Sequence, residues 1–422
     1  MTASTDPGRT DRRLGDLSWL QAGPLAKLLA ALDREGEQAR VVGGAVRNAL
    51  LRLSPGDVDV ATTATPAEVM QRAKAAGFKP VPTGIEHGTV TVVVAGTPFE
   101  VTTLRQDVAT FVRKAEVRFG RDWKTDAERR DFTMNALSVA ADGIVYDYVG
   151  GLADLDARRV RFIGDPARRI AEDYLRILRF FRFHAAYGRG TPDSAGLHAC
   201  IEGRAGLDLL SRERVRMEMV KLLVAPGVAL AVTAMAEAGL VVPVLGGVPF
   251  LADLAALVEI ERTLGLAPDA VRRLAAFALL IAEDAERLWQ RLRLTNAEHE
   301  RLLSMAEGWR RIAPQTGEQE ARALIYRIGP ERYADCVLLA WSRSGAPPDN
   351  GQWRDLVALP QRWTAPKFPL RAADFIARGI PKGPQLGAAL RIAEAAWIAA
   401  DYPGDPAELD QISSAAVRDA SK

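Results

Sequence analysis

The sequence has few of the residues that build disulfide frameworks or metal centres. Its two cysteines, Cys200 and Cys336, are far apart and form no C-x-x-C pair, so neither a disulfide scaffold nor a zinc site is predicted. The four histidines are also scattered, and none belongs to an H-E-x-x-H or His-Asp cluster. Isolated thiols fit a reducing compartment, and we expect a cytoplasmic protein.

Long apolar runs and a large net charge are also missing. The most apolar region, 224–254, is interrupted by Glu237, Pro243 and Pro249, whereas a membrane-spanning helix needs about 20 apolar residues. We therefore predict buried helices there and no membrane association. The first 16 residues are polar, so 1–20 is expected to be a flexible lead without a signal peptide. A net charge of +2 means that only local basic patches could indicate nucleic-acid binding.

The segment 41–63 combines the features of a nucleotide site. Two valines lead into Gly43-Gly44, a helical pattern follows, and a Ser-Pro-Gly turn precedes an alternating stretch that predicts a strand from Asp57 to Ala61. Asp57 and Asp59 would then share one face, and a divalent cation would relieve their repulsion. Magnesium prefers carboxylate and phosphate oxygens, and glycines before a helix allow a triphosphate to approach. The alternative is a solvated Asp-x-Asp beside an ordinary turn.

The same segment carries a family resemblance. G-G-x-V-R followed by D-x-D-x-A-T resembles the first motif of class II tRNA nucleotidyltransferases and bacterial poly(A) polymerases, which belong to the polymerase-β-like superfamily. The family usually has Asp after the arginine, whereas this chain has Asn48, which keeps a hydrogen bond but not an ion pair. The resemblance implies an α+β fold, in which a head with a small mixed sheet precedes a helical neck, body and tail.

Sequence patterns divide the chain further. We expect a flexible lead at 1–20, a nucleotidyltransferase head at 21–150, a helical neck at 151–225 and a tRNA-binding body and tail at 226–422. The head is predicted to hold about five strands, with a hairpin of 87–94 and 97–104 turning at Ala95-Gly96. Residues 105–130 show no clear period and carry eight basic residues against five acids, which suggests a mobile basic loop over phosphates or RNA ends, or a merely solvated loop.

Two further segments match family motifs. Glu100, in F-E-V-T-T-L-R, could be an exposed edge residue, but the matching family acid completes the catalytic carboxylates. Residues 129–137 resemble R-R-D-F-T-x-N-A-L, and adjacent arginines suit triphosphate oxygens. The resemblance assigns Arg130 to phosphate, Asp131 to ribose and Asn135 to structural support. It also implies a flexible joint at 147–152. Phosphate contacts from the first motif would come from Gly43, Gly44 and Arg47.

A helix is predicted from Asp165 through Phe183, with Asp173, Arg176, Arg179 and Arg182 recurring every three residues. Simple salt bridging within the helix is the alternative. Cytosine and adenine both present an amino donor beside a ring acceptor, so one Asp and one Arg can select CTP and ATP. UTP and GTP would leave mispaired polar groups, each costing about 1–3 kcal/mol. The E-D-x-x-R motif of the family gives this role to Asp173 and Arg176. The resemblance assigns Arg179 and Arg182 to nucleotide contacts or to holding the pocket.

The second half reads as successive helices with breaks at Pro268, Pro314, 329–330 and 346–348, and its tail again resembles the family. A charged helix at 211–223 is expected to serve packing and ion pairs. The expected function is template-independent, Mg²⁺-dependent addition of C, C and A to tRNA 3′ ends from CTP and ATP. Partners would be tRNA and these nucleotides, with no obligate protein partner.

Three alternatives remain open. A poly(A) polymerase would carry a basic G-R-R-F-R stretch where this chain has T-G-I-E-H-G at 83–88. A CC-only or A-only enzyme shares every motif named above. A non-enzymatic RNA-binding module would not need the intact acids.

Overall fold

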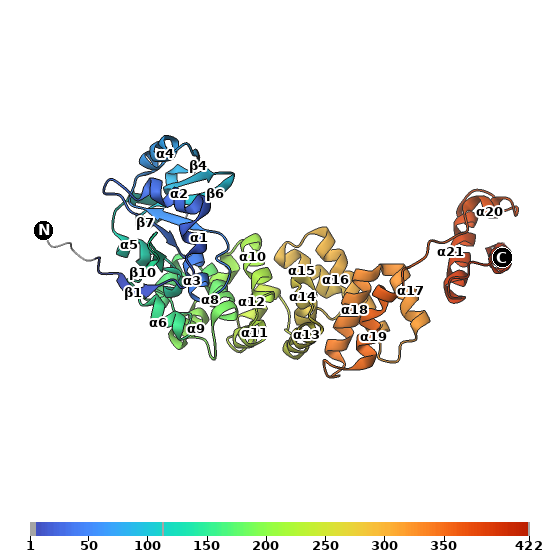
Figure 1. The fold of residues 1–422 in the computed structure, drawn as a ribbon. Helices are drawn as coiled ribbons and strands as arrows, with labels where there is room; N and C mark the ends of the chain where they lie inside the picture. The colour runs from blue at the N-terminus through green and yellow to red at the C-terminus, as the bar shows by residue number, and fades with distance from the viewer. Residues whose placement is uncertain (1–5, 112–113, 421–422) are drawn as a thin grey trace. The chain divides into compact units, whose positions relative to one another are not determined.

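The computed structural model describes residues 6–111 and 114–420. The chain forms two compact units, residues 1–244 and 245–422, and each is described by itself (Figure 1). The first contains the sheets and the helices up to the region of α11 (Val228–Glu237), and the second is helical. The domain boundaries predicted at residues 20, 150 and 225 stay predictions.

An eight-stranded mixed sheet forms the centre of the first unit. All neighbouring strands are antiparallel except β3 and β6, which are parallel. The strands lie in the order β1 (Arg9–Arg13), β10 (Ile144–Tyr146), β9 (Ser138–Val139), β2 (Ala39–Val42), β3 (Asp59–Thr62), β6 (Thr97–Thr103), β5 (Thr89–Val94) and β4 (Lys79–Gly84).

The expected flexible lead is wrong for Arg9–Arg13, which pairs with β10 as an edge strand. Its mostly exposed side chains explain why no hydrophobic pattern marks it. A buried ion pair supports this segment, because Arg40 of β2 pairs with Asp6 at 2.7 Å. Residues 1–5 of the expected lead lie outside the described residues.

Local sequence rules predicted several elements correctly. The hairpin turns at Ala95 and Gly96, whose φ values of 48° and 83° suit a two-residue type I′ turn. Helix α4 (Pro66–Ala75) begins with a reciprocal capping box of Thr65 and Glu68, which the Thr-Pro-Ala-Glu sequence favours. Helix α3 (Gly44–Leu50) follows Gly43 as predicted, and helix α2 (Gly23–Leu32) precedes β2.

The predicted loop at 105–130 is wrong. Strands β7 (Arg105–Phe111) and β8 (Lys114–Phe119) form a separate two-stranded antiparallel sheet, and helix α5 (Trp123–Glu128) follows. Polar and apolar residues alternate in β8, which is a strand period within a charged segment, whereas β7 has no such alternation. Residues 112 and 113 and the side chains of 106–118 lie outside the described part, so the predicted contacts of these basic side chains stay predictions.

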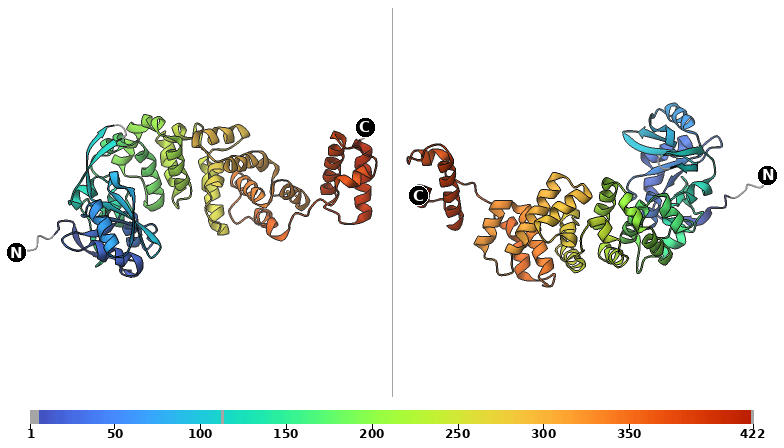
Figure 2. Two further views of the ribbon diagram at one scale, coloured as in Figure 1. Left: turned by 90° about the horizontal axis from the view of Figure 1, so that it is seen from above. Right: turned by 180° about the vertical axis from the view of Figure 1, so that it is seen from behind.

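Helices pack beside the sheet in the first unit (Figure 2). They are α6 (Gly151–Asp156), α7 (Pro166–Glu172), α8 (Leu175–Tyr187), α9 (Ser194–Glu202) and α10 (Arg212–Leu223). Their shared core contains the tilted and stacked rings of Phe132, Phe162, Phe180 and Phe183. At the expected flexible joint, Asp147 accepts hydrogen bonds from four backbone N–H groups, of residues 149–152, and so caps the start of α6.

The second unit follows the predicted breaks. Its longer helices are α13 (Leu251–Leu264), α14 (Ala270–Ala278), α15 (Ala282–Leu292), α16 (Asn296–Gly308), α17 (Glu318–Ile328), α18 (Pro330–Arg343), α19 (Gly351–Arg362), α21 (Pro384–Ala399) and α22 (Pro406–Ala420). Trp341 and Trp353 stack in its core with ring centroids 6.2 Å apart. Within the described residues, no helix is long and apolar enough to cross a membrane.

Candidate functional site

A cavity of about 520 Å³ in the first unit collects most of the predicted site residues. Nine of the twelve line it, namely Gly43, Gly44, Arg47, Asp59, Arg130, Asp131, Asp173, Arg176 and Arg179. They come from the starts of α3 and β3, the 129–135 segment, and the α7–α8 region. Segments more than 100 residues apart in the sequence therefore meet at one cavity.

The acids of this site lie at one end of the central sheet. Asp59 is the first residue of β3 and is the register partner of Glu100 on the parallel strand β6. Asp57 lies before the strand in an exposed bend, so the prediction that both aspartates share one strand is wrong. The Ser-Pro-Gly turn extends two residues further than the alternation suggested.

The charge of Asp59 is only partly compensated. Burial raises the pKa of Asp59, the carboxylates of Glu100 and Asp57 raise it further, and the nearby Arg130 opposes them. A carboxylate that is destabilised by two like charges favours a bound cation. The described residues contain no group of three such ligands close enough to hold a metal alone, so oxygen atoms of a bound nucleotide would have to complete the coordination.

Gly43 allows the backbone to pass close to the arginine side of the cavity. Its φ is 72°, and a Cβ atom there would lie 3.2 Å from a terminal nitrogen of Arg130. Another residue would be strained at this φ and crowded as well. Gly44 then begins α3, whose first N–H groups lie at the cavity.

Arg47 is a buried cation held by neutral acceptors. Arg47 is only 6% exposed. Its guanidinium donates to the Asn135 side-chain oxygen at 2.5 Å, the Tyr187 hydroxyl at 2.7 Å and the Asn48 side-chain oxygen at 2.9 Å. Burial lowers its pKa. No carboxylate forms an ion pair with it in the described part of the chain. An anion in the cavity would supply the missing countercharge.

The 129–135 segment provides a second set of charges. Arg130 pairs with Asp126 at 3.2 Å, and Asp131 pairs with Arg179 of α8. Burial alone would raise the pKa of Asp131, but the Arg179 guanidinium and a hydrogen bond from Asn135 outweigh it and hold the pKa below its usual value. Asn135 thus supports Arg47 and Asp131 together, as expected.

The predicted continuous helix from Asp165 to Phe183 is wrong. Helix α7 ends at Glu172, and Asp173 adopts an extended backbone with φ −158° and ψ 106° before α8 begins at Leu175. Asp173 accepts from Arg214 at 2.7 Å, whereas Arg176 donates to Glu172 at 2.6 Å. Both side chains line the cavity, but each is held by a different partner.

Arg182 does not line this cavity. It pairs with the buried Glu218 of α10, and its guanidinium lies 4.2 Å from the centre of the Phe183 ring. A nucleotide contact of Arg182 stays a prediction, and its ion pair with Glu218 fits the alternative role of holding the pocket. Glu218 confirms the expectation that the 211–223 helix serves packing and ion pairs.

Three cavity residues were missed, namely Leu175, Phe183 and Arg214. Phe183 was predicted only as the end of a helix, whereas in the structure it lines the cavity. Arg214 belongs to α10, and no local pattern links it to Asp173, because the two residues are 41 positions apart. Only the packing of α10 against α8 brings them together.

Comparisons with known proteins agree with this arrangement. A family model described as the poly A polymerase head domain matches residues 39–161. The mouse mitochondrial CCA tRNA nucleotidyltransferase 1 is 34% identical over 398 residues, covering 91% of this chain and 88% of that protein. The CCA-adding enzyme of Limosilactobacillus fermentum is 32% identical, covering 87% and 90%. The crystal structure of the Bacillus stearothermophilus CCA-adding enzyme in complex with CTP has a TM-score of 0.71 and 28% identity, covering 90% and 94%.

Proposed function

The chain belongs to the family of CCA tRNA nucleotidyltransferases, and we propose that the cavity described above is the site at which it extends tRNA. The enzyme adds C, C and A to tRNA 3′ ends, takes the nucleotides from CTP and ATP, and releases pyrophosphate. Similarity to CCA-adding enzymes along nearly the whole chain carries this conclusion. The charge pattern of the cavity supports it independently.

Magnesium is the cofactor generally used by nucleotidyltransferases of this class, and the acids at the sheet end fit it. Asp59 and Asp57 would hold it, and Glu100 beside Asp59 would orient it or the attacking hydroxyl. Bound Mg²⁺ would lower the pKa of the terminal ribose hydroxyl and would stabilise the negative charge of the triphosphate and of its pyrophosphate leaving group. The raised pKa of Asp59 supports this assignment, because a cation removes the repulsion that raises it.

The basic side of the cavity would bind the triphosphate. Arg130 shares the Asp126 carboxylate with Arg129, and Arg47 has no carboxylate partner among the described residues. The Gly43-Gly44 turn would let the phosphates approach the start of α3. Asp131 stays ionised and can accept from a ribose hydroxyl while it holds Arg179. Arg179 lies in the cavity as expected, whereas Arg182 would support its wall through Glu218.

Asp173 and Arg176 would select the base. Asp173 would accept from the amino group of cytosine or adenine, and Arg176 would donate to the adjacent ring nitrogen. Both must first exchange their present partners, Arg214 and Glu172, for the base. Both exchanges break a partly exposed ion pair, which typically contributes about 0–1 kcal/mol, and hydrogen bonds to the base would offset that loss.

Incubation with tRNA lacking its 3′ CCA tests this function. We expect CTP alone to give two added residues, CTP with ATP to give CCA, and UTP or GTP to add almost nothing, as read by sequencing of the product. A long A-tail would indicate a poly(A) polymerase, and arrest after two C residues with both nucleotides would indicate a CC-adding enzyme. The cytoplasmic location and the lack of an obligate protein partner stay predictions, and the mouse relative is named as mitochondrial.

A further inference from the structure

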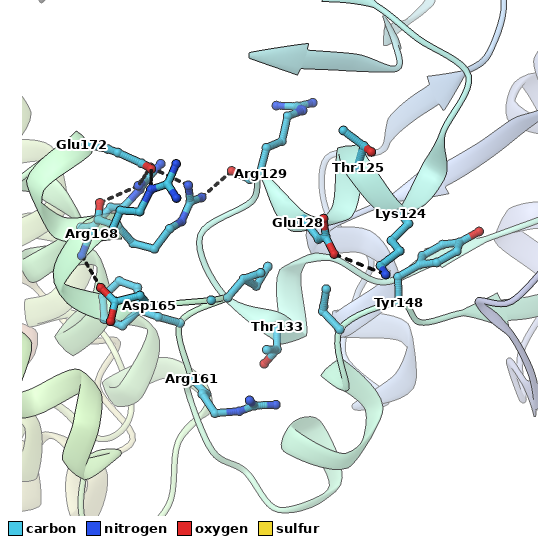
Figure 3. A pocket seen from close by; sticks show the side chains of 16 residues that line it. Lys124, Thr125, Glu128, Arg129, Thr133, Tyr148, Arg161, Asp165, Arg168 and Glu172 are labelled. Carbon is cyan, nitrogen blue, oxygen red and sulfur yellow. Dashed lines mark hydrogen bonds and ion pairs between the residues drawn. The ribbon is translucent and has the colours of Figure 1, made fainter. Parts of the chain in front are cut away.

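A second cavity, of about 800 Å³, lies in the first unit next to the nucleotide cavity (Figure 3). Arg129 lines this second cavity, whereas the next residue, Arg130, lines the nucleotide cavity. Arg176 lines both. The second cavity contains none of the acids assigned to magnesium, so the proposed reaction does not explain it.

Basic side chains dominate its walls. The lining contains three acids, Glu128, Asp165 and Glu172, against six basic residues, Lys124, Arg129, Arg161, Arg168, Arg169 and Arg176. One of the acids is already engaged by the backbone, because Asp165 accepts from the N–H of Arg168 and caps α7. The lining therefore carries an excess of positive charge in a concave space, where an anion is held more strongly than on an open surface.

The ion pairs around this cavity leave the arginines only half compensated. Three carboxylates each accept from two guanidinium groups, namely Asp126 from Arg129 and Arg130, Asp154 from Arg159 and Arg161, and Glu172 from Arg169 and Arg176. Asp126 and Asp154 are 3% and 0% exposed. The side chains of Arg129 and Arg130 are 21% exposed, whereas those of Arg159 and Arg161 are 51% and 41% exposed, so solvent screens the second pair more than the first. Each pair of arginines thus retains about one unit of positive charge for an added anion.

One nitrogen atom of Arg169 lacks a hydrogen-bond acceptor among the described residues. One terminal nitrogen donates to the carbonyl oxygens of Arg129 and Arg130, each at 2.5 Å, and the other donates to Glu172. Its Nε atom is buried and has no hydrogen-bond partner among the described residues. A buried N–H without a partner costs free energy that a bound oxygen atom would recover.

We propose that this cavity is a second anion site, which binds the polyphosphate group of pyrophosphate or of a free nucleotide. Its volume exceeds the 520 Å³ of the nucleotide cavity, so a diphosphate or triphosphate fits. Arginine forks and a lysine match phosphate oxygens, and the Tyr148 and Ile163 side chains provide apolar surface for a sugar or base. The proposal stands on the cavity itself and does not depend on CCA addition.

Calorimetric titration of the full chain with pyrophosphate in the presence of Mg²⁺ tests the proposal. The test variant reverses two cavity charges, Lys124→Glu with Arg168→Glu, whose side chains are 59% and 82% exposed. Both residues lie in the first turn of a helix, where an acidic side chain is favoured, so the variant is expected to fold. The matched control is Arg34→Glu with Lys74→Glu, two exposed residues that line neither cavity.

We expect two pyrophosphate sites per chain in the wild type and in the control. In the test variant, one site should weaken by about tenfold or more, the loss expected for one charge-assisted hydrogen bond, while the other is unchanged. The count of two sites rests on the proposed function, whereas the loss in the test variant does not. Wild-type pyrophosphate binding that the test variant leaves unweakened, or equal weakening in both variants, would overturn the proposal. A second titration uses a short 5′-hydroxyl RNA in place of pyrophosphate, with the same wild type and variants. If the cavity variant weakens RNA binding and leaves pyrophosphate binding unchanged, the cavity belongs to the RNA backbone and the proposal is wrong.

Discussion

The two sides of the nucleotide cavity carry opposite and separately uncompensated charges. At the sheet end, burial raises the pKa of Asp59, the carboxylates of Glu100 and Asp57 raise it further, and Arg130 opposes them. On the helical side, Arg47 is buried among neutral acceptors. A magnesium–triphosphate complex supplies a cation to the first side and an anion to the second. Each side of the cavity is therefore arranged for one half of the same ligand.

The largest expected effect comes from the acidic side. Asp59→Asn should lower the rate of CMP incorporation by about a thousandfold, because a neutral amide is a poor Mg²⁺ ligand. The same change removes one of the mutually repelling charges, so the thermal midpoint should stay level or rise. Single-turnover assays and thermal melts measure the two effects.

Asp156→Asn serves as the control for this prediction, because Asp156 is an exposed acid of α6 that lines neither cavity. It should leave the incorporation rate unchanged. If Asp59→Asn keeps more than a tenth of the wild-type rate, Asp59 is not an essential metal ligand.

A smaller effect is expected where the helical side meets the base. Asp173→Ala should reduce the preference for CTP and ATP over UTP and GTP by about 10- to 100-fold, since one buried hydrogen bond to the base is lost. The ratio of kcat/KM values for the four nucleotides measures this preference. Asp208→Ala, at an exposed position of η3 (Gly203–Leu209), is the matched control. An unchanged preference in Asp173→Ala would exclude a direct contact between Asp173 and the base.

The smallest expected effect tests why Arg47 lacks a carboxylate. Asn48→Asp would place a negative charge on the atom that now accepts from Arg47 at 2.9 Å, and the resulting ion pair should raise KM for CTP by about fivefold. The kcat should change little, because the hydrogen bond from Arg47 is kept. The thermal midpoint should fall slightly, because Asp cannot donate the hydrogen bond that Asn48 Nδ2 gives to the Ser54 carbonyl oxygen at 3.1 Å. Asn296→Asp, at the exposed start of α16, controls for added charge. A KM that falls or stays constant would show that the charge of Arg47 does not serve the triphosphate.

Features that depend on neighbouring residues were predictable from the sequence. The α4 capping box and the Ala95-Gly96 hairpin turn are decided by contacts within a few residues. Strands β7 and β8 were missed, since β7 has no polar–apolar alternation and the alternation of β8 covers only six residues of a charged segment. The early end of α7 was missed as well, because no proline or glycine stands at Asp173 or Tyr174 to mark the break between the two helices.

The sequence by itself determined the family, the acids and arginines of the site, and the alternation of helices and turns, because each depends on residue types at short spacing. Only the tertiary structure decided that Arg182 turns to Glu218, that Arg214 holds Asp173, and that paired arginines surround a second cavity. Those partners lie 36 and 41 residues apart. Ion pairs over such separations are set by how helices pack, and no local pattern in the chain encodes which charged faces will meet.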